Sequence, residues 1–384
     1  MGPHFFSLTV LVFAGVLSVA TASAESKPLD QLWKYELRGD TPQGILVDRA
    51  GRPFLFVTLK SGGLAVLRTG RPLEPPQEVA RIPIRDLGTL DAMHLTQQGN
   101  RLYLALGDLF AAGGAKAGLA IVDVSQPAAP KVLGVWSSAE KLNGSATVVV
   151  DNDHAYLGAM SAGIMILDIR DPAHIQLQST FRPDPDFPRK NPNAVQRPNA
   201  RGLALEGNRL FVAYDAGGVR VLDVSNREQP REIGRYINLA MGQKQQAYNN
   251  LIVDGDRLYA AIDYAGLEIL DIQRVDAIRQ VGWWNPWNAH TLKNVWFNSP
   301  GHTNQLEFDR KKHLIYLSAG DSELQVVQVS KPDDPQLVAH FGQPQNGLGT
   351  WGVTLGKDAA YLTYMTALVP FRGTWSGVVA VKCK

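Results

Sequence analysis

A segment rich in tryptophan and histidine, residues 283–304, is the part of the sequence best suited to recognising a ligand. Four of the eight Trp residues lie within the fourteen positions 283–296, beside His290 and several amide side chains. Exposed aromatic rings next to hydrogen-bonding groups are typical of surfaces that bind a sugar, a peptide or a protein. A shorter segment, 365–377, repeats the combination of aromatic and arginine side chains. The candidate ligand-binding residues of the two segments are Trp284, Trp287, His290, Trp296, Arg372 and Trp375.

The sequence leaves open a second interpretation of this segment, in which the tryptophans pack against one another as a small core of their own loop. It gives no support for a metal site. His290 and His302 lack the third and fourth ligands that zinc requires, and no HExxH spacing supplies them. Asp184 and Asp186 lack the glycine turn and the distal Glu of a calcium loop. We therefore expect no metal and no cofactor.

A second set of polar residues stands at the start of short apolar runs further along the chain. Side chains of His, Asn and Arg grouped at one mouth could polarise a carbonyl group or orient a water molecule. No GxSxG motif is present, and no spacing assembles Ser, His and Asp, so catalytic residues are not assigned and enzymatic activity stays open. The candidates of this set are His94, Arg201, Asn249, His302, Asn304 and Trp351.

The elements that must position these residues repeat along the chain. An apolar run of the form Gly-Leu-x-Ile-Leu-Asp recurs, and the residue at its Asp position falls at 68, 123, 168, 223, 271, 328 and 382. Turn signals such as Gly99-Asn100 and Gly255-Asp256 precede the run, and dipeptides of this kind join antiparallel strands. Each unit thus contains four short strands. Seven such units without helical periodicity predict an all-β fold, a seven-bladed β-propeller.

The two ends of the chain are expected to close this ring. The last unit stops at Lys384 after its third strand, while the alternating run 31–37 offers a strand that no other unit uses. Pairing the two would complete the last blade and leave few exposed edges. The predicted blades form one domain, 25–384, and cover approximately residues 44–84, 88–138, 144–183, 199–237, 247–284, 302–342 and 347–384 plus strand 31–37.

The four strands of a blade alternate in direction, so the connections after second and fourth strands emerge on one face. We call this the mouth face and the opposite one the plain face. All the long connections fall on the mouth face, at 107–118, 182–200, 238–247, 284–302 and 365–377. The Asp that ends each third strand stands before a Ser/Pro turn on the plain face, where a carboxylate accepts backbone N–H groups. We interpret Asp123, Asp168, Asp223 and Asp271 as structural residues of these turns.

The repeated run resembles the LVIVD repeat, which occurs in exported bacterial and archaeal proteins. The resemblance covers roughly residues 30–384, with five good copies, and Arg68, Gln328 and Lys382 depart from the repeated Asp. It implies a propeller fold and export, and it implies no particular activity. The WD-repeat signature, in which Gly-His is followed by Trp-Asp, and the Asp-box motif are not present.

Composition narrows the function classes. The 38 Lys and Arg residues nearly balance the 36 Asp and Glu residues, and a net charge of +2 provides no basic field for nucleic acid. The single Cys, Cys383, permits no disulfide within the chain. The uncharged run 8–22, closed by Ala22-Ser23-Ala24, predicts a signal peptide, residues 1–24, and it is too short for a stable membrane span.

We therefore expect a periplasmic or secreted protein. The leading hypothesis is a binding or scaffold module whose mouth face engages a protein or a polysaccharide. The alternative is a hydrolase, lactonase or isomerase that works at the channel mouth, a hypothesis that rests on analogy with other propellers.

Overall fold

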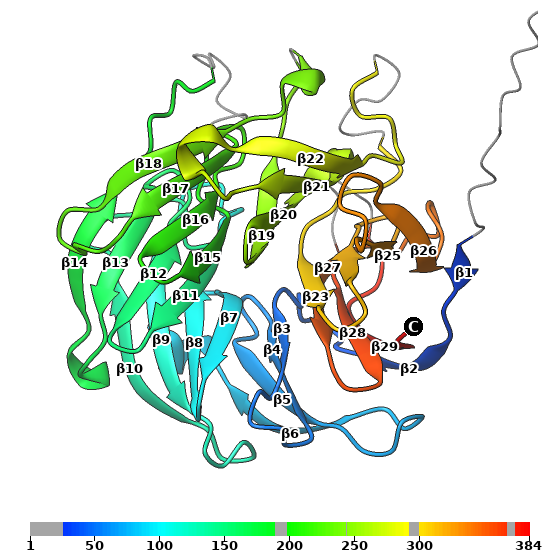
Figure 1. Ribbon diagram of the computed structural model, residues 1–384. Coiled ribbons are helices and arrows are strands. Elements are labelled where there is room, and N and C mark those ends of the chain that lie inside the picture. The colour runs from blue at the N-terminus through cyan, green and yellow to red at the C-terminus, as the bar shows by residue number, and fades with distance from the viewer. Residues whose placement is uncertain (1–25, 189–197, 243, 292–298, 367–372) are drawn as a thin grey trace, which may run out of the picture.

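Seven β-sheets are arranged around a central axis in the computed structural model (Figure 1). The structure describes residues 26–188, 198–242, 244–291, 299–366 and 373–384. The predicted signal peptide, Trp296 and Arg372 lie outside these ranges. Within them, every regular element is a strand or a short 3₁₀ helix. The predicted seven-bladed propeller is confirmed.

Each blade is an antiparallel sheet of four strands whose first strand lies nearest the axis (Figure 1). Blades 1 to 3 consist of β3 (Ile45–Val47), β4 (Phe54–Thr58), β5 (Leu64–Arg68) and β6 (Gln77–Ile82); β7 (Ala92–Gln98), β8 (Arg101–Leu106), β9 (Gly118–Asp123) and β10 (Lys131–Ser137); and β11 (Thr147–Asp151), β12 (His154–Gly158), β13 (Ile164–Asp168) and β14 (Gln176–Phe181). Blades 4 and 5 consist of β15 (Gly202–Glu206), β16 (Arg209–Ala213), β17 (Val219–Asp223) and β18 (Arg231–Tyr236); and β19 (Tyr248–Asp254), β20 (Arg257–Ile262), β21 (Gly266–Asp271) and β22 (Arg279–Trp284).

The last two blades include strands from the N-terminal segment. Blade 6 consists of β23 (Leu306–Asp309), β24 (Leu314–Ser318), β25 (Leu324–Gln328) and β26 (Gln336–Phe341), with β1 (Lys27–Pro28) added, and blade 7 of β27 (Thr350–Leu355), β28 (Ala359–Tyr364), β29 (Gly377–Lys382) and β2 (Gln31–Glu36). Short 3₁₀ helices lie in the connections: η1 (Ile84–Leu87), η2 (Pro172–His174), η4 (Leu239–Met241), η5 (Asp263–Ala265) and η6 (Val275–Ala277).

The ring closes as the sequence predicts. Strand β2 pairs antiparallel with β29, with Trp33 opposite Ala380, and supplies the outer strand that the last unit lacks. One feature was not anticipated: β1 pairs in parallel with β26, with Lys27 opposite Ala339. The outer strand of each of blades 2 to 5 contacts the following blade. The contacting segment of that following blade is the connection between its third and fourth strands. Gly134 and Gly282 mark two such contacts, because an added Cβ would lie 1.7 Å from Pro172 O and 1.9 Å from Pro332 O.

The hydrophobic core is divided among the seven interfaces between neighbouring blades. The third strand lies inside its blade and is covered on both faces, so it is buried along nearly its whole length. This explains why the repeated run is continuously apolar, whereas the outer strand β2 alternates between exposed and buried residues.

The repeated Asp ends the third strand, and its structural role is confirmed. In blades 2 to 5 the Asp Oδ1 accepts the backbone N–H of the residue two positions later, at 2.8–3.0 Å. The bonds are Asp123 to Ser125, Asp168 to Arg170, Asp223 to Ser225 and Asp271 to Gln273. These hydrogen bonds are the main cause of the lowered pKa of Asp123, Asp223 and Asp271, while the Arg170 side chain is the main cause for Asp168, and they fix the turn on the plain face.

Candidate binding site at the channel mouth

A small pocket of about 20 Å³ lies on the propeller axis at the mouth face, and we call it the axial pocket. Its polar and aromatic lining comes mostly from residues at the start of first strands. Five of the six predicted channel-mouth residues line it: His94, Arg201, Asn249, Asn304 and Trp351. Gln43, Met93, Leu109, Ala146, Thr147, Asn250 and Gln305 complete the lining. The structure thus brings together residues that are more than 250 positions apart in the chain.

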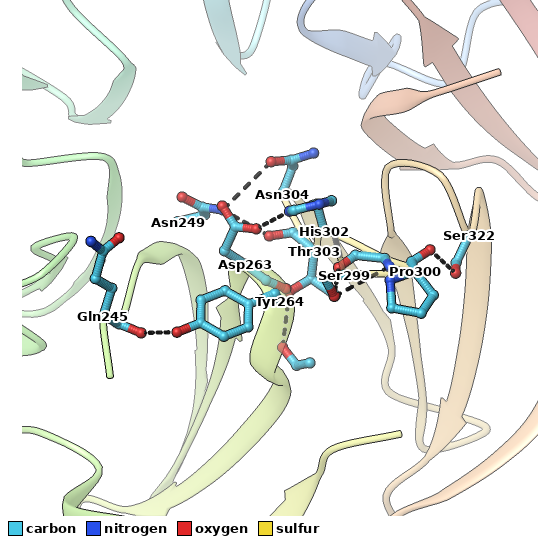
Figure 2. Close-up of polar contacts among 12 residues, drawn as sticks. Gln245, Asn249, Asp263, Tyr264, Ser299, Pro300, His302, Thr303, Asn304 and Ser322 are labelled. Carbon is cyan, nitrogen blue, oxygen red and sulfur yellow. Dashed lines mark hydrogen bonds and ion pairs between the residues drawn. The ribbon is translucent and has the colours of Figure 1, made fainter. Parts of the chain in front are cut away.

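His302, the sixth predicted residue, does not line the axial pocket, and its expected placement is wrong. The side chain is only 1% exposed, and its Nδ1 lies 2.5 Å from Asp263 Oδ1 (Figure 2). Its backbone N–H donates to Ala319 O. Asp263 belongs to blade 5 and His302 leads into blade 6, so the pair connects two blades. The sequence gives the position of His302 near a first strand but not the direction of its ring.

A network of amide groups forms one side of the axial pocket. Asn249 Nδ2 donates to Thr303 O at 2.8 Å and lies 3.5 Å from Asn304 Oδ1 (Figure 2). Asn304 Nδ2 in turn donates to Thr350 O at 3.3 Å. Both contacts of the Asn249 side chain use its Nδ2, and neither involves its Oδ1. Asn249 Oδ1 is buried and has no hydrogen-bond partner among the described residues.

Gln43 repeats this feature on the opposite side of the axial pocket. Its backbone is held on both sides, since Gln43 N donates to Thr58 O and Gln43 O accepts from Thr363 Oγ1. Its Nε2 lies 3.0 Å from Met365 Sδ, whereas its Oε1 is buried without a partner among the described residues. Gln43 precedes the first strand of blade 1 and stands outside the repeated run, so the repeats did not identify it.

A second pocket, of about 170 Å³, opens beside the axial pocket, and we call it the side pocket. The two pockets share Leu109 and Arg201. Asp215, Asp263 and Arg201 are the charged residues that line the side pocket, and Asn199 Nδ2 donates to Asp215 Oδ2 at 3.0 Å. Burial raises the pKa of Asp215, the nearby Asp263 adds to this effect, and Arg201 and Asn199 oppose it.

The backbone of Asp215 explains why this carboxyl group faces the pocket. Asp215 has φ of +48° in the tight turn between the second and third strands of blade 4, where the chain reverses at the mouth face. Asp tolerates this left-handed conformation better than most residues. In blade 5 the equivalent position is Asp263, which begins η5. The repeat search aligned strands rather than these turns, and therefore missed both residues.

An aromatic edge borders the two pockets. Phe110, from the long connection in blade 2, is 46% exposed and contacts Trp351 edge-on, with ring centroids 5.4 Å apart. Lys60 Nζ lies 5.6 Å from the Phe110 ring and forms an ion pair with Asp108 at 2.9 Å. The guanidinium of Arg201 lies 6.0 Å from the Trp351 ring. Exposed aromatic surface therefore adjoins polar side chains at the mouth, on a connection that the sequence identified only by its length.

The predicted aromatic segment near residue 290 is packed down more than expected. Trp284 is 7% exposed and belongs to the core between blades 5 and 6, so its expected exposure is wrong. It contacts the half-buried Trp287 edge-on at 5.7 Å. His290 is exposed, but its Nδ1 lies 2.8 Å from Asn285 Nδ2 and its ring contacts Trp283. These contacts agree with the alternative in which the rings form the core of their own loop.

Trp375 is likewise engaged within the protein. Its ring lies 5.5 Å from that of Tyr364, and Lys34 Nζ sits 3.8 Å above it. This places Trp375 near the junction between β2 and β29, where the ring closes. The predicted aromatic residues within the described ranges therefore support loops and blade contacts, and the exposed aromatic edge of the mouth is formed by Phe110.

Burial reduces the charge of the channel below the mouth. It lowers the pKa of His94 to about 4, with a smaller contribution from Arg49, so this imidazole is neutral near pH 7. Burial also raises the pKa of Glu307 to about 7, against the effect of Arg49 and Arg310. In the described ranges, no group of three or more His, Cys, Asp or Glu side chains is arranged to hold a metal ion.

The architecture defines the class of protein, a seven-bladed β-propeller with a polar mouth. The family model of the LVIVD repeat matches residues 112–136, 144–182 and 198–238, so the chain carries LVIVD repeats, as the resemblance indicated. The search of curated proteins gave no match. A helix long and apolar enough to cross a membrane was not found in the described residues.

Solved structures with a similar fold include two sets of WD40 repeats and U3-55K. The RRP9 WD40 repeats match with a TM-score of 0.67 and 11% identity over 94% of this chain and 99% of that chain. The C-terminal WD40 domain of Sif2 matches with a TM-score of 0.58 and 9% identity over 94% of this chain and 99% of that chain. U3-55K matches with a TM-score of 0.63 and 11% sequence identity over 91% of this chain and 98% of that chain. At these identities the similarity establishes the fold alone.

Proposed function

We propose that the protein is an exported binding module whose mouth face engages a protein or an extracytoplasmic polymer. The observation that carries this proposal is the pair of adjacent pockets at the channel mouth, which share the lining residues Leu109 and Arg201. Exposed apolar side chains stand on the same face: Phe110 beside the pockets and Leu239, 85% exposed, on η4. Rigid propellers commonly present such a surface on their loops.

The binding surface is tested by affinity capture from the native envelope fraction with wild-type protein, Phe110→Glu and Leu73→Glu. Leu73 is a matched control because it is 72% exposed on the connection between β5 and β6, on the plain face. We expect Phe110→Glu to lose the captured partner and Leu73→Glu to retain it. Equal capture by all three proteins would contradict a mouth-face binding site.

Export is a separate part of the proposal and has its own measurement. Peptide mass spectrometry of the protein purified from native cells should give a mature chain that begins at Glu25, recovered in the envelope or the medium. Recovery of the complete chain from the cytoplasm would contradict export, without affecting the proposed binding site.

A hydrolase, lactonase or isomerase is the second candidate function, and one observation favours it. Asp215 combines a raised pKa with a position in the side pocket, beside the potential electrophilic groups Asn199 and Arg201. A carboxyl group of this kind can act as a general acid or base. Turnover of an ester or lactone panel that Asp215→Asn abolishes would establish this candidate, and the absence of turnover by wild-type protein would leave the binding module.

A further inference from the structure

Two residues that line the axial pocket carry buried hydrogen-bond acceptors that nothing in the described part of the chain satisfies. Asn249 Oδ1 and Gln43 Oε1 are both buried, come from different blades, and belong to residues that line the pocket. A buried acceptor without a donor destabilises the folded state, because it has lost its hydrogen bonds to water and gained none in return. Two such groups on residues that line one pocket indicate that an occupant of the pocket donates a hydrogen bond there.

The charges around the mouth restrict the chemistry of this occupant. Arg201 lines both pockets and disfavours an ammonium group as the donor. Asp215 and the two unsatisfied oxygens disfavour a carboxylate or phosphate. A hydroxyl group has neither conflict, because it donates to an amide oxygen and accepts from a guanidinium or amide N–H at the same time.

We infer that the mouth binds a neutral saccharide, with one hydroxyl or hydroxymethyl group inserted in the axial pocket beside Asn249, where its single O–H donates to Gln43 Oε1. This inference rests on the proposed function and specifies its ligand. The axial pocket, at about 20 Å³, admits a single small group, while the side pocket, at about 170 Å³, gives room for more of the sugar chain. Phe110 offers its exposed ring at the shared edge, where the apolar face of a sugar ring can pack.

The neighbouring groups match this assignment. His94 is neutral near pH 7 because burial lowers its pKa, so the pocket wall adds no second cation beside Arg201. Gln245 and Gln246 line the side pocket with amide groups, which can donate and accept hydrogen bonds. A neutral chain with many hydroxyl groups therefore meets compatible partners along both pockets.

The inference is tested by isothermal titration calorimetry with defined oligosaccharides. Maltohexaose, cellohexaose and chitohexaose represent neutral chains, while oligogalacturonate and a lysine-rich peptide represent acidic and basic ligands. We expect at least one neutral chain to bind and the charged probes to bind at least tenfold more weakly. Failure of every neutral chain to bind, or tighter binding of either charged probe, would overturn the inference.

Gln43→Met separates ligand recognition from a structural role. Met has a similar length and removes the unsatisfied oxygen, so we expect an unchanged or higher melting temperature together with about tenfold weaker saccharide binding. A merely structural Gln43 would instead lower the melting temperature and leave saccharide affinity unchanged. Phe110→Ala should weaken binding about threefold to tenfold through the lost ring contact, and the plain-face control Leu73→Ala should not.

The saccharide inference and the proposed function can fail separately. If Phe110→Glu loses a captured protein partner while the neutral oligosaccharides do not bind wild-type protein, the mouth is a binding site for protein and the saccharide inference is wrong. If neutral oligosaccharides bind equally well to wild-type, Gln43→Met and Phe110→Ala proteins, the saccharide site lies elsewhere and the placement at the mouth is wrong.

Discussion

The third strand of a blade meets the two faces of the propeller in different ways. At the plain face, blades 2 to 5 end this strand with the same residue type, Asp, and the same bond to the backbone two positions later. At the mouth end of the third strand, the residue type varies from blade to blade. The variable position lies two residues after the residue that opens each repeated run, which is Gly in six of the seven units. From blade 1 to blade 7 it is Ala65, Ala120, Met165, Arg220, Glu268, Gln325 and Val379.

This difference follows from what each face has to position. At the plain face, the third strand is followed by a turn into the fourth strand. This turn has nearly the same hydrogen bond in each of blades 2 to 5. The mouth end lies beneath connections of different length and composition. Arg220 and Glu268, both buried, hold the connections that enter their own blades, so the variable position serves particular loops rather than the fold as a whole.

Removing Arg220 should give the largest effect at the mouth face. Its guanidinium donates to Gly217 O, Asp184 O and Glu232, and the ring of Phe187 lies 4.7 Å away. Arg220→Ala leaves buried carbonyl groups without a donor and opens a cavity. We expect the free energy of unfolding, measured by chemical denaturation, to fall by about 3–5 kcal/mol.

Arg235→Ala is the control for this prediction. Arg235 contacts the same Phe187 ring, at 4.6 Å, but its side chain is about half exposed and its ion pair with Asp184 is long. We expect a loss below about 1 kcal/mol. Similar losses for the two variants would show that ring contact, rather than the buried hydrogen bonds of Arg220, holds the connection.

The contrast between the faces also explains how far the sequence predicts this molecule. Seven units, the strand order and the closing strand 31–37 follow from the repeats, because each blade must bury the same third strand and form the same plain-face turn. Five of the six channel-mouth residues were found because first strands line the axis. The expected orientations of His302 and Trp284 were wrong because spacing does not give the direction of a side chain in an irregular connection.

The residues that sequence reasoning missed share one property. Gln43, Phe110 and Asp215 stand outside the repeated run, in turns or connections of the mouth face, and each acquires its role from groups far away in the chain. The signal in the sequence is the equivalent place of Asp215 and Asp263 in the turns that follow the second strands of blades 4 and 5. Alignment of the turns as well as the strands would have placed two carboxyl groups near the mouth.

Glu268 makes a smaller, pH-dependent test of the mouth face. It is buried, accepts from Tyr236 Oη at 2.8 Å and Tyr248 Oη at 2.7 Å, and also bonds Gln280. Burial raises its pKa from 4.5 to about 7, while these hydrogen bonds oppose the shift. The native protein therefore holds a proton that the unfolded chain releases. The resulting stabilisation is complete below pH 4.5 and is lost as the pH rises through about 7.

Between pH 5 and 7, this group should lower the free energy of unfolding by up to about 1.4 kcal/mol per pH unit. Glu268→Gln removes that contribution, so urea denaturation of the variant should show a flatter pH dependence than the wild type. Glu307→Gln is a parallel test, since burial raises the pKa of Glu307 to about 7 as well and its replacement should flatten the pH dependence in the same way. An unchanged pH dependence in Glu268→Gln would show that Glu268 is already ionised at pH 5.

Asp123→Ala should have the smallest effect and tests the plain face. The variant loses the hydrogen bond from Ser125 N, at 2.8 Å, in a turn exposed to water, where solvent can replace part of what is lost. We expect the melting temperature to fall by about 1–2 °C, with no change in ligand binding at the mouth. Because the same turn closes blades 2 to 5, Asp168→Ala should have a similar effect. A much larger loss in one blade would mean that the plain-face turns are not equivalent, and the contrast between a uniform plain face and a specialised mouth face would then be wrong.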